Sequence, residues 1–166
     1  MFHAKNYIKV TSLEEAYELN QKKSNAIIGG MLWLKMSNRN MQTAIDLSGL
    51  GLDKIEEQED AFSIGCMCTL RQLEIHEALN RYFGGAMKAC TRHIVGTQFR
   101  NGATVGGSIF GRFGFSDILT CLLALDTYVE LYHAGVIALS EFVEMPRDND
   151  ILVRIIIKKD GRKIAY

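Results

Sequence analysis

A dense cluster of glycines constrains this chain more than any other feature of its sequence. Five of the fifteen glycines fall between positions 102 and 114: Gly102, Gly106, Gly107, Gly111 and Gly114. Glycine at this density, placed between periodic segments, indicates backbone that turns sharply or lies very close to a ligand. We expect Gly107 in particular to take a positive φ and to leave no room for a Cβ atom.

A second glycine pair, Gly29-Gly30, follows a short apolar strand over Asn25–Ile28. Both glycine loops, Ala26–Trp33 and Gly102–Ser108, stand at the ends of expected strands. Consecutive backbone N–H groups in such a loop can cradle a diphosphate without a cluster of Lys or Arg. Each loop alone is equally consistent with a plain turn. The dinucleotide pattern G-x-G-x-x-G and the P-loop pattern G-x-x-x-x-G-K-[ST] are both absent from the sequence.

Length and charge narrow the class of protein further. At 166 residues the chain suits roughly one domain of about 150 residues, and its 48% apolar content excludes intrinsic disorder. Nineteen basic residues balance nineteen acidic ones, which argues against a nucleic-acid or membrane-surface protein. No signal-peptide pattern or membrane-length apolar run occurs. We predict a cytoplasmic globular protein with no nucleic-acid or membrane partner.

The first third reads as a β-α-β unit, which favours a parallel sheet. A capping box at Ser12–Glu15 opens its helix, which ends near Gln21. The acidic segment Leu50–Asp60 reads as a solvated connection, so we predict lobes over residues 1–55 and 56–166. The expected strands are Asn6–Val10, Asn25–Ile28 and Thr43–Leu47, with a short helix or turn at Met31–Lys35.

The second lobe reads as α+β with mainly antiparallel pairing. A turn at Ala134-Gly135 joins a hairpin, and Asp160-Gly161 turns the chain towards Lys163–Tyr166. The expected strands are Phe62–Gly65, Thr127–Tyr132, Val136–Leu139 and Ile151–Ile157, and the expected helices are Thr69–Tyr82, Gly85–His93 and the almost wholly apolar Ser116–Leu125.

Cysteines and histidines give no sign of a metal or catalytic centre. Cys66-Met67-Cys68 would point its two thiols to opposite faces of a strand, and no C-x-x-C or H-E-x-x-H pattern occurs. We therefore expect buried free thiols that pack as small hydrophobic groups. The cysteines are Cys66, Cys68, Cys90 and Cys121, and the histidines are His3, His76, His93 and His133.

Three segments of this chain resemble the FAD-binding domain of molybdopterin dehydrogenases: Thr104–Ser108, then Ser116-Asp117, then the run Leu122–Asp126. That family holds the flavin subunits or domains of xanthine dehydrogenase, carbon monoxide dehydrogenase and their relatives. The resemblance implies a two-lobed α+β fold with FAD held non-covalently between the lobes. Further matches along the chain are Leu13–Ala16, Ile28–Gly30, Asp46-Leu47, Ile64-Gly65, Thr69-Leu70, Arg100–Gly107, Glu141-Phe142 and Ile151-Leu152.

The resemblance also implies a role for each site residue. Around the diphosphate and one side of the flavin it places Ile27, Ile28, Gly29, Gly30, Met31, Leu32 and Trp33. On the other side of the diphosphate it places Ala103, Thr104, Gly106, Gly107 and Ser108, with Phe110 beside the cofactor. Ser116 and Asp117 would accept hydrogen bonds from ribose or ribityl hydroxyls, Ile94 would lie near the isoalloxazine and Leu152 against the adenine.

The implied task is electron transfer within a multi-subunit oxidoreductase of the xanthine dehydrogenase family. An iron–sulfur subunit would reduce the flavin, which would pass electrons to NAD or another acceptor. A separate molybdopterin-binding subunit would oxidise the substrate. Because the flavin carries the chemistry, no residue here is expected to act as a general acid or base, and no metal site is expected.

Several positions depart from the family pattern. Met31 replaces a Thr or Ser, Ser108 replaces an Asn, and Gly111–Gly114 replaces a Ser-Pro. Arg112, within that last segment, is expected to be solvated. The family also continues into a small C-terminal domain beyond the position of Tyr166. Two alternatives therefore stay open: a flavin-free assembly or regulatory module, and the same fold binding a different nucleotide or acting as a substrate oxidase.

Overall fold

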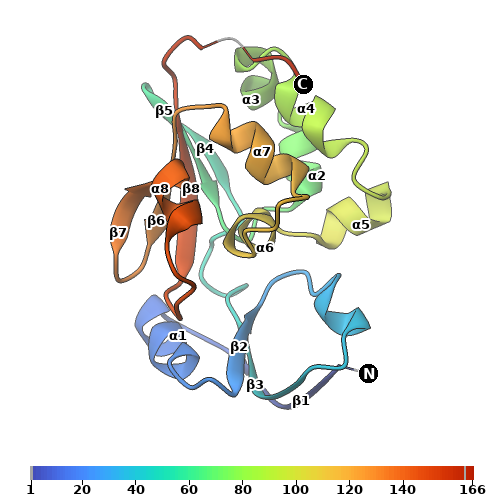
Figure 1. Ribbon diagram of the computed structural model, residues 1–166, viewed down its shortest axis with the longest axis vertical. Helices are drawn as coiled ribbons and strands as arrows, with labels where there is room; N and C mark the ends of the chain where they lie inside the picture. The colour runs from blue at the N-terminus through green and yellow to red at the C-terminus, as the bar shows by residue number, and fades with distance from the viewer. Residues whose placement is uncertain (1, 163) are drawn as a thin grey trace.

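Two β-sheets organise the computed structural model, which describes residues 2–162 and 164–166 (Figure 1). The smaller sheet is parallel and has the strand order β1-β3-β2. Helix α1 (Leu13–Asn20) connects β1 to β2, the strands on either side of β3, and this helical crossover lets them run parallel in one sheet. The predicted parallel unit is thus confirmed. Its strands are β1 (His3–Lys9), β2 (Asn25–Ile28) and β3 (Asn40–Asp46).

Only half of the predicted capping box forms at the start of α1. The Ser12 hydroxyl accepts from the Glu15 amide at 3.1 Å. The Glu15 carboxylate, however, accepts from the amide of Thr11 at 2.8 Å and from the Thr11 hydroxyl at 3.1 Å. The carboxylate thus bonds to the residue before the N-cap and not to Ser12 itself. The full capping box of this chain lies instead at Thr69 and Gln72.

The larger sheet is antiparallel, with the order β4-β5-β8-β6-β7. The acidic segment predicted as a solvated connection contains its edge strand β4 (Ile55–Glu57), in which Ile55 pairs with Ile64. The predicted hairpin is confirmed, and Gly135, at φ +75°, begins its second strand directly after the turn. The other strands are β5 (Ala61–Gly65), β6 (Thr127–Leu131), β7 (Gly135–Ala138) and β8 (Leu152–Lys158).

Short helices cover the larger sheet and correct two predictions. The single helix expected over Thr69–Tyr82 breaks at His76, whose ring nitrogen accepts from the Leu79 amide at 3.2 Å and opens a new helix. The glycine-rich stretch is mostly helical, whereas a loop after a strand was expected. The helices are α2 (Leu70–Ile75), α3 (Glu77–Tyr82), α4 (Ala86–Thr91), α5 (Thr97–Gly102), α6 (Val105–Phe110), α7 (Asp117–Leu123) and α8 (Leu139–Glu144), and a 3₁₀ turn, η1, spans Leu34–Met36.

The chain end also differs from the sequence reading. Gly161 takes φ +76° in the expected turn, while residues 164–166 form no strand. Lys163, the first residue of the segment expected to follow that turn, lies outside the described residues. None of the described helices is long and apolar enough to cross a membrane.

One hydrophobic core joins the two sheets. It includes Ala16 and Ile45 from the small-sheet side and Phe62 and Ile155 from the large sheet. All four cysteine sulfurs belong to this core, as predicted. Burial raises the pKa of the Cys66 thiol to about 12, so this thiol stays protonated. Among residues 2–162 and 164–166, no three His, Cys, Asp or Glu side chains gather to hold a metal ion.

Polar and aromatic contacts hold the two sheets together outside the core. The rings of Tyr17 and His133 stack with centroids 5.5 Å apart, and the Asn20 amide donates to the Asn149 carbonyl at 2.7 Å. These contacts join α1 to the turns beside β6 and β8. They place the end of β2 opposite the start of α6.

Candidate functional site

Two adjoining cavities open between the end of β2 and the start of α6. Their volumes are about 450 Å³ and about 400 Å³, within the roughly 300–1,000 Å³ typical of small-molecule sites. Every residue named for the cofactor lines at least one of them. The first cavity takes Gly30, Met31, Leu32, Trp33, Ile94, Ala103, Ser108, Ser116 and Asp117; the second takes Ile28, Gly106, Phe110 and Leu152; both share Ile27, Gly29, Thr104 and Gly107.

The first glycine loop offers unpaired backbone donors. From Gly29 to Trp33, no backbone N–H donates a hydrogen bond to any residue that the structure describes. Met31 takes a left-handed conformation at φ +57°, which is uncommon for a side chain of its size. Strain of this kind persists at ligand sites when the surrounding structure imposes it. This loop therefore has the free amides that an anion needs.

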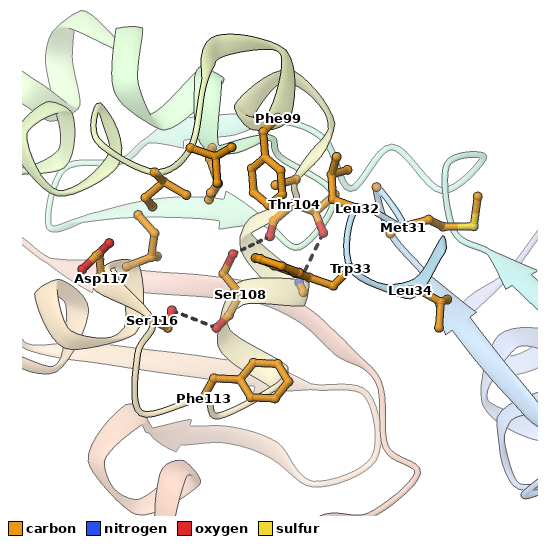
Figure 2. Close-up of a pocket in the computed structure, with 18 of the residues that line it drawn as sticks. Met31, Leu32, Trp33, Leu34, Phe99, Thr104, Ser108, Phe113, Ser116 and Asp117 are labelled. Carbon is orange, nitrogen blue, oxygen red and sulfur yellow. Dashed lines mark hydrogen bonds between the residues drawn. The ribbon is translucent and has the colours of Figure 1, made fainter. Parts of the chain in front are cut away.

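The second glycine segment does not form the expected cradle. The Val105 amide donates to the Cys68 carbonyl and the Gly106 amide to the Cys66 carbonyl, both at 2.8 Å. The Gly107 amide donates to the Thr104 hydroxyl oxygen at 3.2 Å (Figure 2). These amides are occupied because the first turn of α6 docks on the turn after β5. What this segment offers a ligand is the Thr104 hydroxyl hydrogen, which has no acceptor among the described residues.

Most glycines near the cavities make room for protein rather than for a ligand. A Cβ on Gly30 would lie 1.5 Å from the Gly102 carbonyl oxygen, and one on Gly29 would lie 2.5 Å from the Thr104 hydroxyl. A Cβ on Gly106 would lie 2.7 Å from the Cys66 carbonyl oxygen. The contacts of Gly29 and Gly30 bring the two glycine segments against each other, and that of Gly106 brings α6 against the turn after β5.

Gly107 has a different environment. The nearest atom to a Cβ placed there is the Thr104 hydroxyl oxygen at 3.1 Å, and the residue is exposed where the two cavities meet. Its backbone is helical, so the predicted positive φ is wrong. Its missing side chain nevertheless leaves space that belongs to neither the core nor a neighbouring loop.

Ser116 and Asp117 divide two roles at the start of α7. The Ser116 hydroxyl accepts from the Leu119 amide and donates to the Ser108 carbonyl, both at 3.2 Å. Ser116 therefore caps the helix, which leaves the Asp117 carboxylate available for another partner. Its Oδ1 accepts from the Tyr166 hydroxyl at 2.9 Å, and this bond raises the pKa of Tyr166 to about 12.

Aromatic side chains that sequence reasoning missed surround the first cavity. Trp33 meets Phe99 edge-on with centroids 5.6 Å apart, and Phe113 stacks on Phe115 at 5.2 Å. Phe99, Phe113 and Phe115 all line the cavity. The only available signal was the number of phenylalanines around the glycine motif. Such flat apolar walls suit a planar ring system.

A buried ion pair positions the helix that carries Phe99. Arg100 Nε lies 2.7 Å from Glu74 Oε2, and both side chains are only 6% exposed. Arg100 also donates to the Ile94 carbonyl at 3.1 Å, which holds the turn before α5. The hydrogen bond from Arg100 lowers the pKa of Glu74. Val95, within that turn, takes φ +51° although it is β-branched.

The second cavity has both apolar and polar lining residues. Phe110 and Leu152 line it together with several polar residues that sequence reasoning missed: Asn20, Asn25, Arg39, Asp148, Asn149 and Asp150. No periodic pattern marks these residues, because they come from separate elements. Arg39 is the only Lys or Arg among the described residues that line either cavity.

Arg112 is not solvated as expected. Its guanidinium lies 4.0 Å from the centre of the Phe142 ring and donates to the Met145 carbonyl. Burial lowers the pKa of Arg112. The Arg112 side chain thus stacks on the Phe142 ring, and the residue lines neither cavity.

A family model described as FAD binding domain in molybdopterin dehydrogenase matches residues 2–159. The chain belongs to this family. A curated relative, the uncharacterized protein YgfM of Escherichia coli K12, is 28% identical over 163 residues, which is 96% of this chain. The chain spans 61% of that relative's length.

Solved structures show the same fold. A chain of carbon monoxide dehydrogenase from Hydrogenophaga pseudoflava matches with a TM-score of 0.83 at 19% identity, over 94% of this chain and 59% of its own. A chain of quinoline 2-oxidoreductase from Pseudomonas putida 86 matches with a TM-score of 0.83 at 19% identity, over 95% of this chain and 60% of its own. The two-lobed α+β fold is thus confirmed.

Proposed function

We propose that this chain binds FAD non-covalently across the two cavities. The observation that carries the proposal is the row of free amides at Gly29–Trp33, a segment whose five residues all line the first cavity. A diphosphate needs several donors at one place, and this loop offers them in a protein with a formal charge of zero. The Thr104 hydroxyl adds a donor from the opposite lobe.

The chemistry of the two cavities supports a proposal for where each end of the ligand lies. The first cavity holds the aromatic residues Trp33 and Phe99, which suit the isoalloxazine ring. The Asp117 carboxylate lies at this end and can accept hydrogen bonds from ribityl hydroxyls. The second cavity, with Phe110 and Leu152, suits the adenine.

Family membership supports a proposal for the biological role. FAD, when bound, supplies one- and two-electron transfer, while the residues of this chain bind and orient it. We propose that the chain is the flavin component of a molybdenum hydroxylase-type oxidoreductase. Its partners would be an iron–sulfur subunit and a molybdopterin-binding subunit, and its electron acceptor NAD or another oxidant.

A titration of FAD into the flavin-free protein tests the binding. We expect saturable binding, with the flavin released on heat or acid denaturation. His93 also lines the first cavity, where its ring accepts a hydrogen bond from Arg92 Nε at 2.9 Å. Flavin that stays with the precipitated protein would indicate a covalent link between the two. A protein that never binds FAD would favour the flavin-free assembly or regulatory module.

Gly107→Val locates the binding site. The added side chain fills the space where the cavities meet, so we expect FAD affinity to fall at least about a hundredfold, or about 2.7 kcal/mol. Helix propensity does not penalise Val relative to Gly, so the stability of the flavin-free protein should stay near wild type. Gly114→Val is the matched control, because Gly114 is exposed, faces open space and lines neither cavity. Equal loss of affinity in both variants would place the ligand elsewhere.

A further inference from the structure

Two phenylalanine rings form an open stack at the first cavity. The centroids of Phe113 and Phe115 lie 5.2 Å apart, and their ring planes differ by only 14°. Both residues line the cavity, yet Phe113 is 43% exposed and Phe115 is 73% exposed. Apolar surface left in water costs free energy that a covering ligand removes. The outer ring, Phe115, is therefore the accessible part of the stack.

The protein holds the inner ring in place. A Cβ on Gly111 would overlap the Phe113 ring, so this ring packs directly on the Gly111 backbone. The Ser116 amide donates to the Phe113 carbonyl at 3.0 Å. The Arg147 guanidinium lies 5.7 Å from the centre of the Phe113 ring and donates to the Gly111 carbonyl at 2.6 Å. Phe113 thus forms a fixed base on which Phe115 stacks.

The stack has a different geometry from the pair formed by Trp33 and Phe99. Those two rings meet at an interplanar angle of 67°, so they share no flat face. The nearly parallel rings of Phe113 and Phe115 leave an outer face to which a further flat ring can be added. Offset parallel stacking is a favoured arrangement of aromatic rings. The stack therefore offers a planar ligand a surface of matching shape.

The stack also lies close to the carboxylate proposed for the ribityl chain. Phe115 is two residues before Asp117, and both residues line the first cavity. Two residues of extended chain span at most about 7 Å. The ring system of a flavin is attached directly to its ribityl chain. A flavin whose ribityl hydroxyls bond to Asp117 therefore has its ring system within reach of Phe115.

Resting on the proposed FAD site, we propose that Phe115, backed by Phe113, stacks on the isoalloxazine ring. This contact makes the first cavity selective for a flavin nucleotide over a nucleotide that carries no flavin. It depends on a flat ring and involves neither the diphosphate nor the adenine. The free amides at Gly29–Trp33, in contrast, can bind a diphosphate of either nucleotide.

The experiment titrates FAD and ADP separately into the flavin-free wild type, Phe115→Leu and Phe115→Tyr. Phe115→Leu should bind FAD about tenfold more weakly, because stacking on an aromatic side chain is lost, and should bind ADP with unchanged affinity. Phe115→Tyr keeps the ring and should bind FAD like wild type. Tyr7→Leu is the matched control, because Tyr7 is 61% exposed and lines neither cavity. Both of its affinities should match those of wild type.

The pattern of the losses separates stacking from a structural role. The assignment of Phe115 is wrong if Phe115→Leu binds FAD like wild type, or if it loses affinity for FAD and ADP by the same factor. It is equally wrong if Phe115→Tyr loses as much FAD affinity as Phe115→Leu. Where the wild type binds FAD but ADP too weakly to measure, the comparison of the Leu and Tyr variants decides. If the wild type binds no FAD, the proposed function is overturned together with this inference.

Discussion

The two glycine segments look alike in sequence but contribute differently to the site. In the loop from Gly29 to Trp33, the backbone amides have no partner among the described residues. In the segment from Ala103 to Ser108, the amides of the first helical turn are bonded to the turn at Cys66–Cys68 or to Thr104. The first segment offers a ligand its backbone N–H groups. The second offers the Thr104 hydroxyl and, at Gly107, a helix surface without a side chain.

The difference arises from what each segment packs against. The second segment lies on the core of the larger lobe, where every buried donor needs an acceptor. The first loop leaves the small sheet and meets the larger lobe at Gly102, at Thr104 and at Phe99. A glycine-rich motif therefore does not by itself identify an anion cradle. Its amides must also be left free by the rest of the fold.

The largest expected effect is a loss of stability when the ion pair between Glu74 and Arg100, which holds α5 and the second segment after it, is broken. Glu74→Gln leaves Arg100 buried without its charge partner, and removing one side of a buried pair costs about 3–5 kcal/mol. Urea unfolding measures the loss, with Glu59→Gln as an exposed control that should change little. A loss no larger than that of the control would show that the pair does not support α5.

The same pair predicts a dependence on pH. The folded state lowers the pKa of Glu74 below its ordinary value of 4.5. Its contribution to stability is therefore complete above that value and is lost as the pH falls through the lower, folded-state pKa. Below pH 4.5, the stability of wild type should approach that of Glu74→Gln. A gap between the two proteins that persists through this range would contradict the assignment.

Gly30→Ala tests the contact between the two segments. The new Cβ would overlap the Gly102 carbonyl oxygen, and overpacking of this kind costs about 1–3 kcal/mol. We expect the melting temperature and the FAD affinity to fall together, unlike the effect of Gly107→Val. An unchanged melting temperature would mean that the loops do not touch in solution.

Asp117→Ala should affect binding alone, because Ser116 already caps α7. Loss of a charged acceptor for a ribityl hydroxyl costs about 1.5–3 kcal/mol, or roughly a tenfold to hundredfold loss of FAD affinity. Tyr166→Phe keeps the carboxylate and should bind FAD like wild type. Equal dissociation constants for wild type and Asp117→Ala would remove Asp117 from the site.

The smallest effect concerns the strained turn before α5. Val95 is 71% exposed and takes φ +51°, a conformation that Asn tolerates far better than a β-branched residue. Val95→Asn should raise the free energy of unfolding by about 1 kcal/mol. Chemical denaturation measures the gain. A loss of stability would show that the turn is not strained in solution.

Local patterns in the sequence were enough to predict the parallel unit, the hairpin and the last strand of the large sheet. Such patterns work where neighbouring residues decide the outcome, as with the alternation along β6 or the turn at Gly135. The family motif also named residues that all line the two cavities. It did so because each position of a family motif corresponds to one position in the shared fold.

Tertiary structure alone decided which of those residues remain free to bind. Whether the amide of Gly106 is available depends on the Cys66 carbonyl, forty positions earlier in the chain. The gathering of Phe99, Phe113 and Phe115 likewise depends on packing between separate elements. Hydrogen-bond saturation is a property of the folded surroundings, so no local sequence pattern can report it.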